Sequence, residues 1–324
     1  MEPDDSLLRK ATLVARTDGW FGTRFRCTLG PLWISDTEVL HSRFTGRYDP
    51  NRLETRYNLR RTAYVLDTRT GRDARLPGLT RALAEMEPEI VDDEDVSPDG
   101  KWLLWSERWG RCLLASVKGT ETRTCPEDDD GCYRWVRWLP DSRRWLEFFG
   151  CNGRAHHVLL HDVRRPKLAQ HVPVAGREDA LCSIKCVLSL DRAVGIMGPD
   201  RDLGLSEPNA RAEVFRLGLL PPTPVRKVGV VSVPRGSPRS VPHLSPGGDR
   251  IAWEIVVRLP GSLCRTEAWV CRTDGAAMRL VGSVTSVSDS DTSSPPSLRL
   301  QWLPGGRRLS FEWQDRLYTV PVRG

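Results

Sequence analysis

A short motif recurs along this chain at wide and similar intervals. Its clearest copy reads Asp95-Val-Ser-Pro-Asp-Gly-Lys-Trp-Leu-Leu-Trp105. Three further copies occupy 137–147, 243–253 and 301–311, and two degenerate copies occupy 33–40 and 188–195. The equivalent positions are Asp36, Pro98, Pro140, Leu190, Pro246 and Pro304. Their spacing averages about 54 residues, so six repeated units account for the chain.

Each unit is typical of a set of short strands. Pro-Asp-Gly and Pro-Gly-Gly are tight-turn sequences, because Pro fixes φ and Gly accepts a positive φ. The turn separates two apolar runs, a third run follows, and a fourth completes the unit. The third runs are 63–67, 112–117, 157–163, 213–217, 268–272 and 316–320. No window of a dozen residues has a helical period, so the units predict four-stranded antiparallel sheets.

Repeated four-stranded sheets bury both of their faces when they stack radially. The predicted fold class is therefore all-β: a single six-bladed β-propeller of four-stranded antiparallel blades over 1–324. The expected blades are 23–80, 88–125, 131–175, 180–234, 238–285 and 296–324. The last unit stops one strand short, and 10–17 resembles a strand ahead of the first unit. We expect 10–17 to pair as the outer strand of the last blade and to close the ring.

The repeats resemble those of the TolB-like, or WD40-like "PD40", propeller family. The mark of that family is an aromatic or apolar residue, Ser-Pro-Asp-Gly-Lys and then an apolar strand. The match is near complete at Val96 to Trp105, good in three further units and eroded in two. The resemblance implies a propeller over about 31–324. It implies no single function, because the family includes periplasmic scaffolds and the lids of peptidases.

The chain has 12 Trp against 7 Phe and 5 Tyr. Most of these Trp residues lie just before the repeated turn or on the strand after it, where the wedge between two blades needs large side chains. We expect these to be core residues. Trp20, Trp109 and Trp135 lie near loops or strand ends and are expected to be the exposed aromatic residues.

Loop lengths distinguish the two ends of the predicted blades. Connections from first to second strand and from third to fourth are short, whereas those at the other end are long: 43–59, 85–95, 125–133, 198–211, 258–267 and 286–297. Long loops on a rigid scaffold commonly carry binding residues. This long-loop face mixes acidic and basic residues, which favours a protein partner over a nucleic acid. Its candidate contact residues are Arg43, Arg47, Tyr48, Trp109, Asp128, Asp129, Trp135 and Asp202.

The net charge of +6 arises from 48 Lys and Arg against 42 Asp and Glu, spread through the sequence. A nucleic-acid footprint would concentrate basic residues, so no nucleic acid is expected as a partner. The apolar runs are shorter than the ~20 residues of a membrane span, so no membrane insertion is expected. The N-terminus lacks the basic start and apolar stretch of a signal peptide. The sequence leaves the oligomeric state open.

The nine cysteines fall largely near the long-loop face, and two interpretations of them remain open. In the first, four disulfides staple the loops, leaving Cys27 over: Cys125–Cys132, Cys264–Cys271, Cys182–Cys186 and Cys112–Cys151. That pairing implies an oxidising, periplasmic or extracellular compartment and a signal that was removed. In the second, the thiols are free and the chain is complete and cytoplasmic. Zinc is disfavoured, because no Cys-x-x-Cys pair exists.

Sequence motifs for catalysis are scarce. There is no Gly-x-Ser-x-Gly elbow, Walker loop or Rossmann fingerprint, and no cofactor is expected. His156, His157 and His161 resemble a metal cluster, but on a strand His157 and His161 would share one face with ~13 Å between them, too far for one metal ion.

Two functions follow from these observations. The favoured one is a non-enzymatic scaffold that binds another protein through the long-loop face. The alternative is a channel-centred, metal-dependent hydrolase or lactonase, or a sugar-binding propeller, and it rests on analogy with other six-bladed propellers. Its candidate channel-mouth residues are Glu94, Asp95, Arg137 and His243.

Overall fold

The computed structural model describes residues 5–17, 31–45, 60–84, 91–107, 112–124, 133–151, 154–174, 178–182, 184–197, 211–219, 224–232, 237–238, 242–260, 263–287 and 297–322. The chain divides into two compact units. The terminal unit is Met1–Arg16 with Asp179–Gly324, and the middle unit is Thr17–Glu178.

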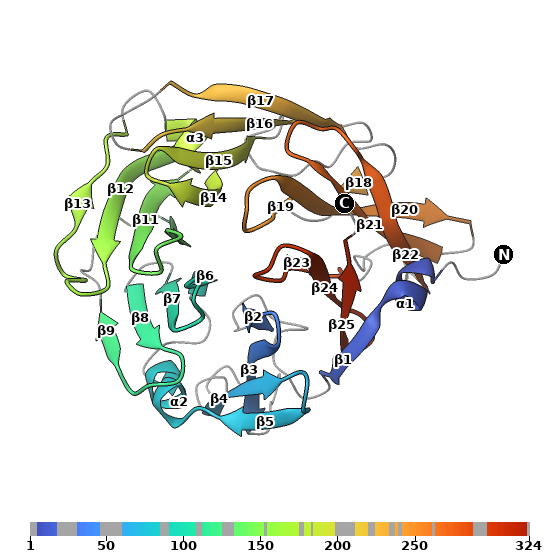
Figure 1. Cartoon of the computed structure of the whole chain (residues 1–324), viewed down its shortest axis with the longest axis horizontal. Helices are drawn as coiled ribbons and strands as arrows, with labels where there is room; N and C mark the ends of the chain where they lie inside the picture. The colour runs from blue at the N-terminus through green and yellow to red at the C-terminus, as the bar shows by residue number, and fades with distance from the viewer. Residues whose placement is uncertain are drawn as a thin grey trace, which may run out of the picture. The chain divides into compact units, whose positions relative to one another are not determined.

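The middle unit contains three antiparallel sheets, each built from consecutive strands (Figure 1). Sheet 1 consists of β2 (Leu32–Ser35), β3 (Glu38–Thr45), β4 (Arg60–Asp67) and β5 (Arg72–Arg75). Sheet 2 consists of β6 (Val91–Val96), β7 (Trp102–Glu107), β8 (Cys112–Ser116) and β9 (Thr122–Thr124). Sheet 3 consists of β10 (Tyr133–Trp138), β11 (Arg144–Cys151), β12 (Arg154–Asp162) and β13 (Gln170–His171).

The terminal unit contains three further antiparallel sheets. Sheet 4 consists of β14 (Ile184–Ser189), β15 (Arg192–Met197), β16 (Arg211–Leu217) and β17 (Arg226–Ser232). In sheet 5 the first strand is split, and the members are β18 (Ser237–Pro238), β19 (His243–Leu244), β20 (Arg250–Leu259), β21 (Leu263–Arg272) and β22 (Arg279–Val287). Sheet 6 consists of β1 (Thr12–Arg16), β23 (Gln301–Trp302), β24 (Arg308–Glu312) and β25 (Arg316–Pro321). The six sheets confirm the predicted fold class, a six-bladed β-propeller.

The N-terminal strand completes the last blade, as the sequence predicts. β1 lies antiparallel to β25, with Thr12 opposite Thr319 and Arg16 opposite Arg316. The strand order of sheet 6 is therefore β1-β25-β24-β23, in which the outer strand comes from the other end of the chain. This pairing covers an edge of β25 that would otherwise expose its backbone N–H and C=O groups.

Three short helices among the described residues are absent from the sequence prediction: α1 (Ser6–Lys10), α2 (Pro77–Ala84) and α3 (Glu178–Cys182). α2 buries Leu79, Ala82 and Leu83 in the core shared by sheets 1 and 2. Each helix is too short for its apolar period to stand out in a window of a dozen residues.

The segment 258–267, expected as a long loop, is part of a β-hairpin instead. β20 continues to Leu259 and β21 begins at Leu263, and these two residues are opposite each other in the register. The apolar runs extend further than the repeat indicates, and Pro260, a residue type common in turns, directly follows β20.

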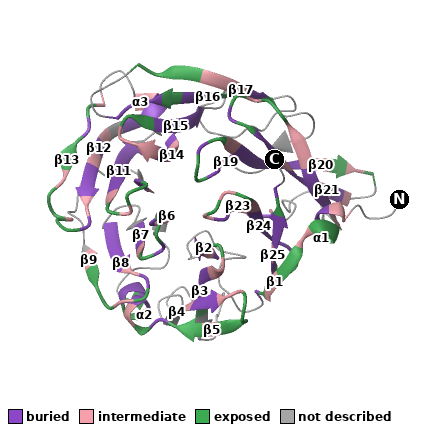
Figure 2. Cartoon of the chain, viewed as in Figure 1, coloured by how far each residue is buried: buried purple, intermediate pink, exposed green. Residues whose placement is uncertain are grey.

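Buried side chains lie on both faces of the middle strands. In the middle unit, Leu40 and Val65 of sheet 1 pack with Leu103 and Trp105 of sheet 2. Figure 2 shows β8 as mostly buried, whereas the outer strands β5 and β13 are mostly exposed. The repeat tryptophans are core residues as predicted, except that Trp102 is only half-buried. The buried ones are Trp33, Trp105, Trp138, Trp145, Trp253, Trp302 and Trp313.

Gly100 and Gly71 have the same backbone conformation, but only Gly100 also packs closely on a neighbouring blade. Gly100, in the turn between β6 and β7, has a φ of +70°, and a Cβ there would lie 2.2 Å from the carbonyl oxygen of Ile34 in sheet 1. Gly71, in the turn between β4 and β5, also has a φ of +70°, but a Cβ there meets nothing within 4 Å.

We expect Gly71→Ala to lower the free energy of unfolding by about 1–2 kcal/mol, the strain of a left-handed alanine. Gly100→Ala carries the same strain and must also displace backbone in sheet 1, so we expect a further loss of about 1–3 kcal/mol. Urea unfolding of the two variants measures the difference. Equal losses would show that Gly100 is needed only for its turn.

Candidate functional site

Most of the predicted partner-binding residues lie outside the described residues. These are Arg47, Tyr48, Trp109, Asp128, Asp129 and Asp202, and the same is true of Cys27, Cys125, Cys132 and Trp20. Arg43 and Trp135 are described and lie on β3 and β10. The strand bounds show unequal connections in both units: long sequences separate β3 from β4 and β15 from β16, whereas β2 joins β3 and β14 joins β15 through short turns.

Arg43 is held in a polar cluster on one face of sheet 1. Its guanidinium forms an ion pair with Asp73 on β5 and lies 5.0 Å from the ring centroid of Tyr64 on β4. Asp73 Oδ1 accepts a hydrogen bond from His41 Nε2 at 2.9 Å, and the His41 ring stacks on Tyr64 at 5.5 Å between centroids. Burial lowers the pKa of His41 more strongly than Asp73 raises it, so this imidazole is neutral at pH 7. The cluster fixes Arg43 while 46% of its side chain stays exposed.

Trp135 is half-buried, so the expectation of an exposed aromatic residue there is wrong. It lies opposite Phe148 in the register of β10 and β11. Cross-strand neighbours project from the same face of a sheet, and the two rings stack with 5.4 Å between centroids and 1° between planes. Trp135 therefore contributes to the packing of sheet 3.

The four predicted channel-mouth residues lie on the first strands of their sheets. Asp95 is bound to the next blade: its Oδ2 accepts the backbone N–H of Trp138 at 3.1 Å, and its carbonyl accepts the indole N–H of Trp138 at 3.1 Å. His243 occupies the same place in its own repeat, and its carbonyl accepts the indole N–H of Trp302 at 3.0 Å. The repeat thus uses this position to hold the tryptophan of the following blade.

Glu94 and Arg137 complete the predicted set. Glu94 is half-buried opposite Trp105 in the register, and the guanidinium of Arg137 donates to the carbonyl of Val136 on its own strand. No group of three or more His, Cys, Asp or Glu side chains that could hold a metal ion occurs in the part of the chain that the structure describes.

Four cysteines among the described residues are free thiols: Cys112, Cys186, Cys264 and Cys271. Cys264 and Cys271 lie on the same strand, β21, and both thiols are free. Seven residues of strand rise by ~23 Å, far more than a disulfide spans, so the expected Cys264–Cys271 bond is wrong. Cys112 and Cys186 are also thiols, and the pairs expected with Cys151 and Cys182 are therefore not formed. The Sγ of Cys186 donates instead to the carbonyl of Pro246 at 3.7 Å.

Two buried carboxylates carry structural contacts that the sequence analysis did not single out. Glu147 Oε2 on β11 lies 2.9 Å from His161 Nε2 on β12, and His161 stacks on Trp145 at 4.9 Å between centroids. This contact places His161 in the core of sheet 3. Glu254 on β20 accepts three hydrogen bonds from the segment before β23. The sequence contains one signal for both residues: each is an acidic residue inside an otherwise apolar strand.

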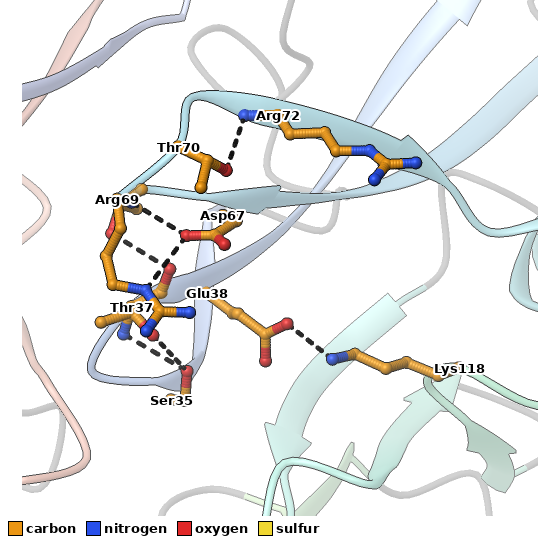
Figure 3. Close-up of polar contacts among 9 residues, drawn as sticks. Ser35, Thr37, Glu38, Asp67, Arg69, Thr70, Arg72 and Lys118 are labelled. Carbon is orange, nitrogen blue, oxygen red and sulfur yellow. Dashed lines mark hydrogen bonds and ion pairs between the residues drawn. The ribbon is translucent and has the colours of Figure 1, made fainter.

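The short-turn end of sheet 1 is closed by its own polar contacts (Figure 3). Asp67 Oδ1 accepts the backbone N–H of Arg69 at 2.9 Å, which lowers the pKa of the Asp67 carboxyl. Glu38 forms an ion pair with Lys118 of sheet 2 at 2.6 Å. Two opposite-charge contacts, Asp67 with Arg69 and Glu38 with Lys118, thus lie at this end.

No family model and no curated protein matches the chain, and no described helix is long and apolar enough to cross a membrane. The chain is similar to a solved oligogalacturonate lyase from Vibrio parahaemolyticus, with a TM-score of 0.54 and 11% identity over 99% of this chain and 96% of that one. It is also similar to the WD40 repeats of RRP9, with a TM-score of 0.53 and 12% identity over 100% of this chain and 99% of that one. One relative is an enzyme by name and the other a repeat domain. At such low identity, these similarities show only that this chain shares their fold, a β-propeller.

Proposed function

We propose that this protein is a non-enzymatic propeller scaffold that binds another protein through its long-loop face. The observation that carries the proposal is the unequal length of the connections. The sequences between Thr45 and Arg60 and between Met197 and Arg211 are long, and both leave the same end of their sheets, away from the repeated turns. Long connections on a rigid framework vary in sequence without disturbing the core, which suits them to recognition.

Arg43 supports a recognition role for this end of sheet 1. It lies near the end of β3, just before the long connection, and Asp73 and Tyr64 fix its orientation. A side chain that is already ordered loses little conformational freedom when a partner binds. Arginine is also enriched in protein interfaces, where its planar group binds carboxylates and stacks on aromatic rings.

The contacts of the channel-mouth residues favour binding over catalysis. The Asp95 carboxylate accepts the backbone N–H of Trp138, and the equivalent residue His243 binds Trp302 through its carbonyl. A general base or metal ligand needs its lone pairs directed to the substrate or ion. At Asp95 one oxygen is directed to the neighbouring strand instead.

Affinity capture with shortened connections tests the proposal. Thr45 and Arg60 are opposite each other in the register, so a two-residue Asn-Gly turn can replace 46–59 without a change in strand pairing. A second variant replaces 198–210 with Gly-Ser-Gly. We expect the proteins that the intact chain captures from its native cell extract to be depleted at least tenfold by the double replacement, as measured by quantitative mass spectrometry.

The matched control is Arg69→Ala with Arg72→Ala, in the self-contained short turn of sheet 1 (Figure 3). This control should capture the same proteins as the intact chain, and all variants should unfold at similar temperatures. Retention of every partner after both connections are shortened would refute the proposal, and so would equal losses with the short-turn control.

A further inference from the structure

A cavity of about 620 Å³ lies in the terminal unit, at the end of its sheets opposite the long connections. It is formed where β16 ends and β17 begins in sheet 4, at the turns on either side of β20 and β21 in sheet 5, and at Val322 after β25. Its charged lining residues are Arg216, Asp249, Arg250, Arg272, Asp274 and Arg279. Four guanidinium groups against two carboxylates leave two positive charges in excess. We call this cavity the arginine pocket.

Like charges are opposite each other in the strand register around the arginine pocket. Arg250 on β20 is the direct partner of Arg272 on β21, and Arg216 on β16 is the direct partner of Arg226 on β17. Such pairs destabilise a sheet because their side chains project from the same face a short distance apart. The sequence of the terminal unit thus contains two unfavourable arginine pairs at one place.

Sheet 3 shows the matched arrangement at the same position of the repeat. There Arg144, four residues after Pro140, is opposite Asp162, and Asp162 forms an ion pair with Arg143. In sheet 5, Arg250 follows Pro246 by the same interval, but its partner is Arg272. An arginine thus replaces the acid that completes the charge match in sheet 3.

Only part of this positive charge is compensated within the protein. Arg250 donates to the carbonyl of Val322 at 3.3 Å and lies 3.8 Å from Asp249, and Arg272 forms an ion pair with Asp274 at 2.9 Å. Across the described ranges, no hydrogen bond or ion pair engages the guanidinium of Arg216 or of Arg279. Two sets of N–H donors at the pocket are therefore available to an anion.

The walls of the arginine pocket are held close together. A Cβ on Gly229 of β17 would lie 2.4 Å from the carbonyl oxygen of Thr273, and a Cβ on Gly275 would lie 2.3 Å from that of Val230. Sheets 4 and 5 approach this closely because neither glycine carries a side chain. The positions of the arginines on the two sheets are therefore set before any ligand binds.

Apolar and uncharged groups complete the lining. Val228, Val270 and Val322 contribute hydrocarbon surface, and Val270 and Val322 are themselves buried. Burial raises the pKa of the Cys271 thiol to about 12, and its Sγ donates to the carbonyl of Arg272 at 3.0 Å. This thiol stays protonated at pH 7, so the pocket offers binding groups and no thiolate nucleophile.

We propose that the arginine pocket binds a small organic phosphate. A phosphate monoester carries close to two negative charges at pH 7, which equals the excess positive charge of the lining. Its oxygens accept the paired N–H donors of arginine, and its carbon-bearing part packs on the valines. The volume lies within the range of sites for small molecules. The site is distinct from the long-loop face and does not depend on its partner.

Calorimetric titration with phenyl phosphate tests the proposal. We expect phenyl phosphate to bind at least tenfold more tightly than inorganic phosphate, which lacks the apolar part, and than benzoate, which has one charge. Arg279→Gln and Arg216→Gln should each weaken phenyl phosphate at least tenfold, the loss expected for one charge-assisted contact. Neither variant should lower the melting temperature of the ligand-free protein, because neither side chain is bound within the described structure.

The matched control is Arg258→Gln, which removes an exposed arginine from the far end of β20, outside the pocket. It should leave the affinity for phenyl phosphate unchanged. The proposal is overturned if phenyl phosphate does not bind, if benzoate or inorganic phosphate binds equally well, or if Arg258→Gln weakens binding as much as Arg279→Gln. The last result would indicate attraction by overall charge.

Discussion

Removal of residues 1–17 is expected to lower the free energy of unfolding by more than 5 kcal/mol, because this segment binds to two blades at once. β1 supplies the outer strand of sheet 6. Leu7 of α1 is fully buried against sheet 5, and Lys10 Nζ donates to the carbonyl of Val281 at 2.8 Å. A buried leucine contributes about 1.5–3 kcal/mol and each hydrogen bond about 1 kcal/mol. The melting temperature should fall by roughly 10–20 °C, measured by circular dichroism.

A single substitution tests whether the packing of α1 on sheet 5, and not only the removal of residues, accounts for the loss of stability. A Cβ on Gly282 of β22 would lie 2.6 Å from Cα and 2.7 Å from N of Leu7. Gly282→Ala should therefore displace α1 and reproduce much of the loss. Gly247→Ala is the matched control, since its Cβ meets only the Asp249 side chain at an ordinary 3.4 Å. An unchanged melting temperature after the deletion would contradict closure of the last blade by the N-terminal strand.

The closing strand could be predicted by counting the strands in each repeat. The last repeat lacks one strand and 10–17 supplies one, so the pairing of β1 with β25 follows from the repeat itself. α1 could not be predicted in this way. Its helix exists because Leu7 enters the core of sheet 5 and Ser6 binds Ser283 there, and these contacts join residues far apart in the sequence. Tertiary packing decides such short helices, and local propensity does not.

The arginine pocket shows why register is needed to find a site. In the sequence, basic residues are spread along the chain, and the connections at the short-turn end are short. Arg250 and Arg272 become neighbours only when the pairing of β20 with β21 is known, and Arg216 joins them only when sheet 4 packs on sheet 5. The predicted Cys264–Cys271 disulfide failed for the same reason, because a strand that is longer than expected separates its two ends. The local sequence pattern shows where strands form, whereas the exact register of their pairing decides which side chains become neighbours.

Glu254 is the second position at which we expect a large effect. Its carboxylate is fully buried on β20. Oε2 accepts hydrogen bonds from Ser297 Oγ at 3.0 Å and from the backbone N–H of Leu298 at 2.9 Å, and Oε1 accepts the N–H of Leu300 at 3.1 Å. The segment 297–300 precedes β23 and has no strand pairing of its own, yet Leu298 and Leu300 are core residues. Buried backbone N–H groups need acceptors, and one side chain supplies them.

Glu254→Ala should lower the free energy of unfolding by about 3–5 kcal/mol, because it leaves two buried N–H donors without their acceptor. Glu213→Ala is the control: it removes a half-exposed glutamate paired with Lys227 in the same unit and should cost less than about 1 kcal/mol. Urea unfolding of both variants at pH 7 measures the difference. Similar small losses would mean that water replaces the carboxylate and that other contacts, such as the burial of Leu298 and Leu300, hold the segment 297–300. A large loss for Glu254→Ala and not for Glu213→Ala would show that the Glu254 carboxylate fixes the position of the segment 297–300, which leads into the last blade. The carboxylate can accept these backbone N–H groups because it is buried among them.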